Sequence, residues 1–173
     1  MQPTNASNRI LRPARGWFVA ASLMLALLLN TIPLGRLPGI PDFVALVLTF
    51  WCIREPLKIG MGIAFLLGLC MDMIDSSVMG QHALAYTLLA FAANSLSRRI
   101  LWFPMIEQAM QVFPLLLLVQ VVMLVIRMLT GAHFPGISYF IGSIVAALLW
   151  YPMTYMLLLP QYQSAEKDEN RPI

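Results

Sequence analysis

The chain has 173 residues, of which 60% are hydrophobic and 11% are charged. A soluble domain usually has about 25% charged and about 45–50% apolar residues, so too few polar side chains remain here to cover a surface in water. The composition excludes a soluble enzyme, a nucleic-acid-binding module and a disordered adaptor, and it predicts that lipid is the main solvent.

Crossing a bilayer core of about 30 Å takes roughly 20 apolar residues in a helix. Five apolar runs approach this length, at residues 16–34, 57–74, 82–96, 109–129 and 136–159. The first run is too long for a cleavable signal peptide and has no small-residue cleavage site. A sixth segment, 42–53, is shorter, so it is either a full span or a half-helix. We expect one domain over 16–160, a tail at 1–15 and a disordered tail at 161–173.

Basic residues decide between these alternatives, because Lys and Arg favour the cytoplasmic side of short loops. If the chain crosses six times from a cytoplasmic N-terminus, nine basic residues lie inside: Arg9, Arg12, Arg15, Arg54, Lys58, Arg98, Arg99, Lys167 and Arg171. Arg36 and Arg127 then lie outside. If the short segment does not cross, every later loop changes sides, and only four basic residues lie inside while seven lie outside. The sequence therefore predicts an all-α bundle of six transmembrane helices with both termini in the cytoplasm, and the pI of 9.1 reflects this orientation.

Small residues at helical spacing mark positions where helix backbones can approach each other. Two such rows occur, on the third and the sixth predicted spans: Gly60, Ala64 and Gly68, then Ser138, Gly142 and Ala146. Each row is expected either to pack inside the bundle or to receive a helix of a partner.

The most polar cluster near a predicted membrane boundary is Asp72, Asp75, Gln81 and His82. Carboxylates in membrane spans are costly and often functional. On a helical wheel both carboxylates share the face of the first small-residue row. An Asp-x-x-Asp pair can hold a divalent cation, but a phosphotransferase of lipid alcohols would need further acidic and basic residues, and none follow. In the structural alternative, Asp75 and the two serines after it end one helix and cap the next.

Other chemistry has little support in the sequence. His82 and His133 lie on separate predicted hairpins without zinc-ligand spacing. Cys52 and Cys70 fall inside predicted spans, where they are expected to pack. No serine-hydrolase elbow, zinc-protease helix or phosphate-binding glycine loop occurs, so we expect no catalytic, cofactor or metal site. Other polar residues of the spans are expected to form interhelical hydrogen bonds or to anchor helix ends: Asn30, Asn94, Gln120 and Arg127.

Several segments between residues 41 and 84 resemble the rod shape-determining protein MreD of proteobacteria. They read Pro41-Asp42-Phe43-Val44-Ala45-Leu46, Trp51, Glu55-Pro56-Leu57-Lys58-Ile59-Gly60, Ala64-Phe65-Leu66-Leu67-Gly68-Leu69 with Asp72, and Met79-Gly80-Gln81-His82-Ala83-Leu84. The resemblance is strongest over residues 41–96. The positions that match the family pattern are Pro41, Asp42, Pro56, Gly60, Gly68, Asp72, Gly80, Gln81 and His82.

These matching positions have a physical interpretation. Pro41 and Asp42 are expected to start a helix and Pro56 to open the next one. The two matching glycines of the first row permit close packing. Asp72 and its neighbours at the start of the fourth span fix either the outer hairpin or a hydrogen-bonded pocket inside the membrane.

The resemblance implies a non-enzymatic inner-membrane component of the machinery that builds the lateral cell wall and maintains rod shape. The partners it implies are MreC, the glycosyltransferase RodA with its penicillin-binding transpeptidase, and the MreB filament. It also implies a fold like the substrate-binding subunits of energy-coupling-factor transporters, which by itself gives no transported ligand.

Two functions therefore compete. The first is a scaffold that holds the single transmembrane helix of MreC, and the small-residue rows and the lack of catalytic motifs favour it. The second is a membrane-embedded subunit that binds or transports a small molecule or a lipid precursor, and the short second segment and the polar cluster favour it. In both, the basic inner loops face anionic phospholipid, which accounts for their charge without nucleic acid.

Overall fold

The computed structural model describes residues 14–32, 39–75 and 78–161. Over these residues the chain is all-helical, without β-strands. Six α-helices and two 3₁₀-helices follow one another: α1 (Gly16–Thr31), α2 (Phe43–Arg54), α3 (Met61–Asp75), α4 (Gln81–Leu101), α5 (Met105–Leu129), η1 (Ile137–Phe140), α6 (Ile141–Leu158) and η2 (Leu159–Gln161). The six predicted helices are confirmed, whereas the predicted tails at 1–15 and 161–173 lie almost entirely outside the described residues.

The start of α3 differs from the prediction. Pro56 does not open a helix, because the amides of Lys58 and Ile59 both donate to the carbonyl oxygen of Glu55 and close a turn. The helix begins only at Met61, and its first hydrogen bond runs from the amide of Ala64 to the carbonyl oxygen of Gly60. Proline permits a first helical turn but does not require one, and here a side-chain contact of the turn with α1 competes with it.

That contact holds the turn against the beginning of α1. The amide of Ala14 donates to Oε1 of Glu55 at 2.9 Å, and Nζ of Lys58 donates to the carbonyl oxygen of Ala14 at 2.8 Å. Further along the chain, α4 passes the same turn, where Nδ2 of Asn94 donates to the carbonyl oxygen of Ile59. The first turn of α1, the α2–α3 turn and the later part of α4 therefore lie at one end of the bundle.

Helix α4 is longer than its apolar run predicts. It continues past residue 96 through Ser97, Arg98 and Arg99 to Leu101. The apolar run ends before the two arginines, but the helix continues through them, because basic side chains in a last turn interact favourably with the helix dipole.

The short second segment forms the centre of the bundle. Every residue of α2 from Val44 to Ile53 is buried, and the helix packs against α1, α4, α5 and α6. Trp51 is fully buried and its indole nitrogen donates to the hydroxyl of Ser22 on α1 at 2.8 Å. With 12 residues, α2 extends for about 18 Å, little more than half of a bilayer core. A helix surrounded by protein need not match the lipid thickness, because its neighbours do so.

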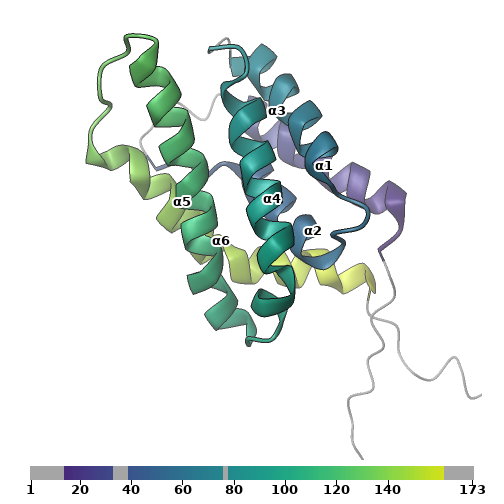
Figure 1. Cartoon of the computed structure of the whole chain (residues 1–173). Coiled ribbons are helices and arrows are strands. Elements are labelled where there is room, and N and C mark those ends of the chain that lie inside the picture. The colour runs from purple at the N-terminus through teal and green to yellow at the C-terminus, as the bar shows by residue number, and fades with distance from the viewer. Residues whose placement is uncertain (1–13, 33–38, 76–77, 162–173) are drawn as a thin grey trace, which may run out of the picture.

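Successive helices run in opposite directions (Figure 1). The α4–α5 connection lies at one end of the bundle and the α3–α4 connection at the other. The charges follow the same division. Of the described Lys and Arg residues, only Arg127, at the end of α5, belongs to the second end, and the others mark the first: Arg15, Arg54, Lys58, Arg98 and Arg99. We call the first the basic end and the second the pocket end.

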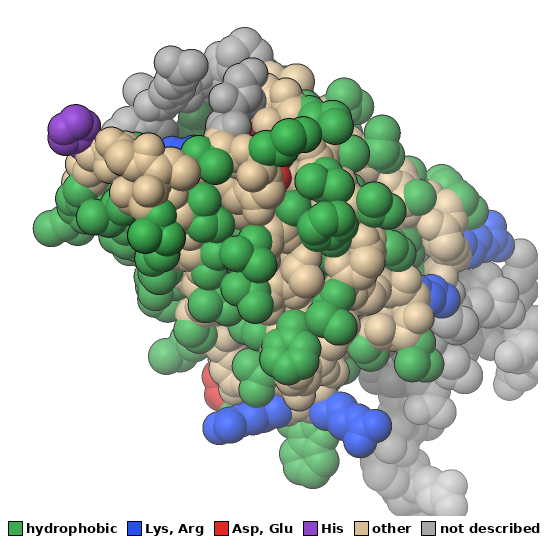
Figure 2. Space-filling model, turned by 45° about the horizontal axis from the view of Figure 1, so that its top comes forward, with side chains coloured by type: hydrophobic (Ala, Val, Ile, Leu, Met, Phe, Trp, Pro, Cys, Tyr) green, Lys and Arg blue, Asp and Glu red, His purple; other side chains and the backbone are tan. Residues whose placement is uncertain are grey.

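The outer surface is apolar. Figure 2 shows hydrophobic side chains over most of one face, with Lys and Arg gathered toward its margins. Many large apolar residues are strongly exposed, among them Leu66, Met110 and Leu148 at 61%, 76% and 74%. Two helical segments are long and apolar enough to cross a membrane, Met105–Leu129 and Ile137–Gln161, and α1 and α2 are shorter apolar helices.

Candidate functional site

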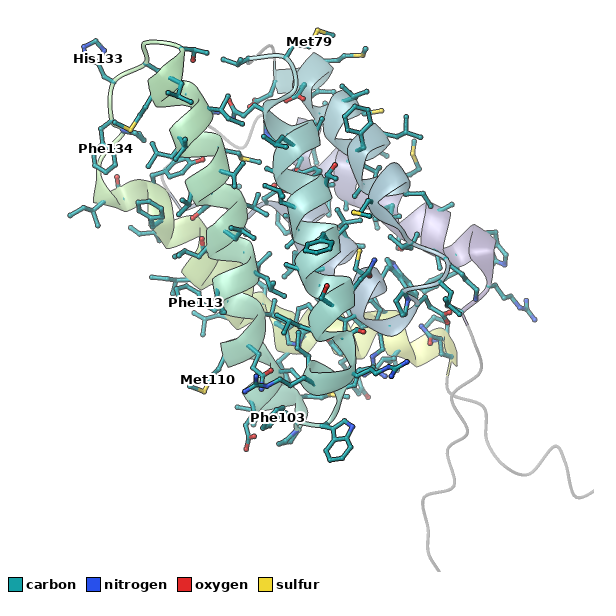
Figure 3. The ribbon with its side chains drawn as sticks, viewed as in Figure 1. Met79, Phe103, Met110, Phe113, His133 and Phe134 are labelled. Carbon is teal, nitrogen blue, oxygen red and sulfur yellow. The ribbon has the colours of Figure 1, made fainter. Side chains whose placement is uncertain are left out.

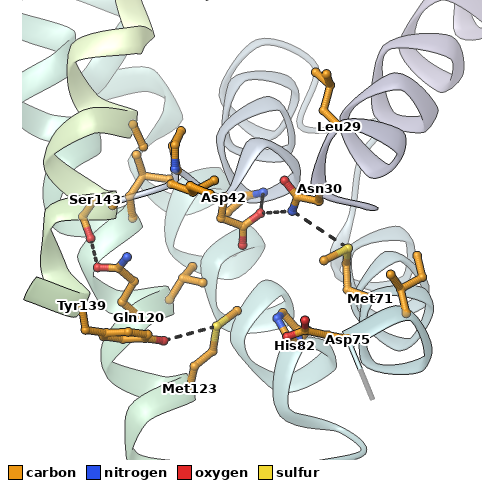
Figure 4. Close-up of a pocket in the computed structure, with 18 of the residues that line it drawn as sticks. Leu29, Asn30, Asp42, Met71, Asp75, His82, Gln120, Met123, Tyr139 and Ser143 are labelled. Atoms are coloured by element: carbon orange, nitrogen blue, oxygen red, sulfur yellow. Dashed lines mark hydrogen bonds between the residues drawn. The ribbon is translucent and has the colours of Figure 1, made fainter. Parts of the chain in front are cut away.

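A pocket of about 610 Å³ lies at the pocket end and is lined by residues of all six α-helices (Figure 4). The chain enters α2 through residues 39–42, which are not helical, and Gly39 has a φ of +112°. Within the described residues, the pocket lies beside this non-helical entry to α2, next to Asp42. Side chains of the surrounding helices face this space, as Figure 4 shows for Asn30, Asp42, Gln120 and Ser143.

Asp42 ties three helices together at the floor of the pocket. As predicted, it caps α2, and its Oδ1 accepts the amide of Ala45 at 3.0 Å. The same oxygen accepts Nδ2 of Asn30 on α1 at 2.9 Å, while Oδ2 accepts the hydroxyl of Tyr86 on α4 at 2.7 Å. Asn30 also accepts the amide of Phe43 at 3.0 Å. The donors are all neutral groups, so the carboxylate is hydrogen-bonded without a counter-charge among them.

Asp72 and His82 join α3 to the beginning of α4. Oδ1 of Asp72 accepts both the amide and the ring Nδ1 of His82 at 2.8 Å, and Oδ2 accepts the amides of Gly80 and Ala83 at 2.9 and 3.3 Å. A carboxylate from α3 thus caps the first turn of α4, whose own N-cap, Gly80, has a φ of +92° and offers no side chain. Because a carboxylate only accepts, the ring Nδ1 of His82 donates this hydrogen bond. His82 lines the pocket and is 5% exposed.

Asp72 and Asp75, which were expected to share one helix face in a single polar cluster, have different surroundings. Asp72 is 4% exposed and faces α4, whereas the side chain of Asp75 is 51% exposed and lies 3.7 Å from a guanidinium nitrogen of Arg127 on α5. Residues three apart on a helix differ in direction by about 60°, which is enough to separate the interior from the rim. The caps of α4 accordingly come from Asp72, and the serines after Asp75 lie outside the described residues.

Gln81 is joined to the rim through Arg127. It is fully buried, and its Oε1 accepts Nε of Arg127 at 3.3 Å. Its Nε2 has no hydrogen-bond partner within the described part of the chain. The predicted four-residue cluster therefore divides into two pairs, Asp72 with His82 in the interior and Asp75 with Arg127 at the rim, with Gln81 joined to the second.

The structure offers no metal-ligand set. Over the described ranges, no group of three or more His, Cys, Asp and Glu side chains is placed to hold a metal ion. His133 is exposed on the α5–η1 connection, points away from the helices (Figure 3) and is not part of the described pocket lining. Cys52 is buried and Cys70 is exposed, and neither forms a disulfide.

The far wall of the pocket is formed by α5, η1 and α6. Gln120 accepts a hydrogen bond from the hydroxyl of Ser143 through its Oε1, and the hydroxyl of Tyr139 lies 3.9 Å from the sulfur of Met123. The predicted interhelical role of Asn30 and Gln120 is confirmed, but their convergence on one pocket is not visible in the sequence. Tyr86, which donates to Asp42, and Ser143, which lines the pocket, were not among the predicted residues, because nothing local distinguishes such a tyrosine or serine from one that faces lipid.

Most of the first small-residue row packs inside the bundle. A Cβ at Gly68 would lie 2.6 Å from the carbonyl carbon of His82 and closer still to Cα of Ala83, so this glycine permits the contact of α3 with α4. Ala64 is fully buried. Gly60 precedes the helix, and a Cβ there would meet no atom within 4 Å. Gly60 is therefore not a close-packing position, contrary to the prediction.

The second row borders the pocket. A Cβ at Gly142 would lie 2.8 Å from Nε2 of Gln120 and 3.0 Å from the carbonyl oxygen of Ile40. Ala146 is 3% exposed and lines the pocket, as does the buried Pro41. Ser138 lies in η1, outside α6, and is half-buried. The inward direction of Gly142 and Ala146 indicates internal packing.

Antiparallel helices, an apolar outer surface and a polar pocket between the helices define the class as a small all-α, membrane-associated protein. The family model for the rod shape-determining protein MreD matches residues 12–159, and the chain belongs to this family. This confirms the resemblance read from residues 41–84 and gives the protein a role in rod-shape determination.

A curated relative agrees with the family match. The rod shape-determining protein MreD of Haemophilus influenzae is 29% identical over 149 residues, which cover 82% of this chain and 89% of that protein. No solved structure matches the chain. The predicted likeness to substrate-binding subunits of energy-coupling-factor transporters therefore stays a prediction.

Proposed function

We propose that this protein is a non-enzymatic scaffold of the inner membrane, which crosses the bilayer six times and binds the transmembrane helix of MreC to support lateral peptidoglycan synthesis. The observation that carries the proposal is family membership over residues 12–159 together with an apolar outer surface. The family is named for the shape that it determines and not for a reaction.

The charge distribution supports the orientation. The described basic residues cluster at the basic end, whereas Asp42, Asp72 and Asp75 all belong to the pocket end. Lys and Arg are retained on the cytoplasmic side of membrane helices. The basic end then faces the cytoplasm and anionic lipid, and the pocket end faces the opposite compartment. Six crossings are an even number, so in this orientation both termini lie in the cytoplasm.

The position of the small residues directs the search for the MreC contact. Gly68, Gly142 and Ala146 are used for packing inside the bundle, so a partner helix has to lie on the exposed apolar faces. Helices in lipid associate through close packing and hydrogen bonds, since apolar side chains alone give no preference over lipid tails. The contact is therefore expected to be confined to one face.

Truncation of exposed residues on different helices tests this proposal. Leu25→Ala, Leu66→Ala, Phe91→Ala and Leu148→Ala remove side chains that are 58%, 61%, 60% and 74% exposed, on α1, α3, α4 and α6, and should leave the fold intact. Each variant is co-expressed with tagged MreC and purified in detergent. We expect the wild-type protein to co-purify with MreC. Variants on one face should co-purify in smaller amounts, although their yield in the membrane is unchanged. Recovery no higher than that of an unrelated six-helix membrane protein would refute the MreC contact.

Further partners follow from the family and are part of the same proposal. RodA and its penicillin-binding transpeptidase would join through MreC or through other exposed faces. Arg98 and Arg99 at the end of α4 are the described candidates for contact with MreB or with anionic headgroups, each worth about 1 kcal/mol near an anionic surface. Reconstitution of the pairwise complexes, with and without MreC, distinguishes direct from indirect contacts.

A further inference from the structure

The pocket at the pocket end has no role in a purely structural scaffold. Its volume of about 610 Å³ lies within the range of about 300–1,000 Å³ typical of small-molecule sites. Polar atoms cluster at its floor and walls, and Leu116, Val119 and Met123 give it an apolar side. A hydrogen-bonding floor with an apolar wall suits a ligand that has one polar group on a short carbon chain.

The pocket disfavours an anion. Its described lining includes Asp42 and Asp75 but no Lys or Arg. A helix N-terminus usually attracts anions, but at α2 the amides of Phe43 and Ala45 already donate to Asn30 and to Asp42. The carboxylate of the cap also opposes the positive end of the helix dipole.

One carboxylate of the pocket end differs from the other two. Asp75 is paired with Arg127, and Asp72, outside the described pocket lining, accepts the ring of His82 and the amides that it caps at the start of α4. Asp42 accepts hydrogen bonds from Asn30, Ala45 and Tyr86, and it forms no salt bridge with the described Lys and Arg residues. Asp42 is half-buried, and a carboxylate that is partly withdrawn from water and held only by neutral donors is stabilised by a nearby cation.

We propose that the pocket binds a primary ammonium group, with Asp42 as its counter-ion. An ammonium has three donors and no acceptor. Besides the carboxylate, the pocket lining offers further oxygen acceptors, among them Oε1 of Gln120 and the hydroxyl oxygen of Ser143, and the ring of Tyr139 adds a face that attracts cations. The carbon chain of the ligand lies against Met123 and its apolar neighbours. The same ammonium chemistry occurs in free amines and in the ethanolamine headgroup of phospholipid.

The probe is hexylamine, compared with hexan-1-ol, which has the same chain without the charge. The full-length protein is placed in nanodiscs of phosphatidylcholine, and its thermal unfolding is measured against probe concentration, because a ligand that binds only the folded state raises the unfolding temperature. We expect hexylamine to stabilise the protein and hexan-1-ol to have no effect at equal concentration. Equal stabilisation by both, or by neither, would overturn the proposal.

Asp42→Asn removes the charge while keeping the cap, since Asn caps helices as well as Asp does. Its amide oxygen can still accept from Ala45 and Asn30, and its amide nitrogen can donate to the hydroxyl of Tyr86. We expect hexylamine affinity to fall by about thirtyfold or more, as on removal of one member of a buried charge pair. Glu107→Gln is the control and should change affinity by less than about twofold, because this carboxylate is exposed in the first turn of α5, outside the described pocket lining. Unchanged affinity in Asp42→Asn would overturn the proposal.

Two further arms identify the source of the ammonium and a competitor within the chain. If the lipid headgroup is the natural ligand, nanodiscs of phosphatidylethanolamine should weaken hexylamine binding, whereas equal binding in both lipids indicates a free amine, and either result supports an ammonium site. Arg36 is the basic residue between α1 and α2 in the sequence. Hexylamine binding that appears in Arg36→Gln but not in the wild type would overturn the proposal.

Discussion

Gly68→Ala should separate α3 from α4, although it adds a single methyl group. The new Cβ would lie 2.6 Å from the carbonyl carbon of His82 and closer still to the backbone of Ala83, whereas ordinary contacts lie at 3.4–4 Å, so the helices must move apart by at least about 0.8 Å. The obstacle is backbone and cannot rotate away. The same shift lengthens the 2.8 Å hydrogen bonds from His82 to Asp72 to about 3.6 Å, beyond the range of a hydrogen bond.

The free energy of unfolding should therefore fall by about 3 kcal/mol or more. Overpacking alone costs about 1–3 kcal/mol, and each weakened hydrogen bond to a charged group adds about 1.5–3 kcal/mol. Replacing Gly by Ala in a helix returns at most about 1 kcal/mol. Gly62→Ala is the control on the same helix, because a Cβ there would meet no atom within 4 Å, and it should be neutral or stabilising by up to about 1 kcal/mol.

Purified protein in detergent micelles, unfolded with sodium dodecyl sulfate and followed by far-UV circular dichroism, measures both variants. Stability of Gly68→Ala within about 0.5 kcal/mol of the wild type would refute the reasoning, since that is the range of surface substitutions. An equal loss in Gly62→Ala would also refute it, because helix propensity rather than the α3–α4 distance would then be responsible.

Other changes test the remaining features. Asp72→Asn replaces an acceptor of backbone amides by a donor and should lower the free energy of unfolding by about 2–4 kcal/mol in the same assay; an unchanged midpoint would exclude Asp72 as the cap of α4. Gly142→Ala should displace the Gln120 amide, 2.8 Å from the new Cβ, and cost about 1–2 kcal/mol, and full stability would show that α6 adjusts freely. In a background without native cysteines, an impermeant maleimide should label Ala132→Cys from outside intact cells and Trp102→Cys only after permeabilisation; the reverse pattern would invert the proposed topology.

The helices could be predicted from the sequence because lipid imposes long apolar runs on them. The cap at Asp42 was also predictable, since a proline followed by an aspartate before an apolar run is a local signal. Prediction failed where a distant contact decided the outcome. Pro56 lies in a turn because Glu55 and Lys58 bind the chain at Ala14, which is more than 40 positions earlier in the sequence.

The pocket was less accessible to prediction than the helices. Its central hydrogen bonds join residues far apart in the chain, such as Tyr86 to Asp42 across 44 positions and Ser143 to Gln120 across 23. The polar residues that take part are each ordinary for a membrane helix. They converge beside the start of α2 at Phe43, and the length of this helix can be read from the sequence, but the arrangement of its neighbours around that start cannot.

The burial of α2 has a consequence for how the protein is made. Three of the helices that surround it, α4, α5 and α6, leave the ribosome after it, and α1 is the one neighbour already present. A 12-residue helix is too short to rest stably in lipid by itself. The bonds of α1 to α2, from Asn30 to Asp42 and from Trp51 to Ser22, are thus the means to retain the pair until synthesis of the later helices is complete. A weakened α1–α2 hairpin should therefore reduce the yield of protein during its synthesis, before it affects the stability of the finished fold.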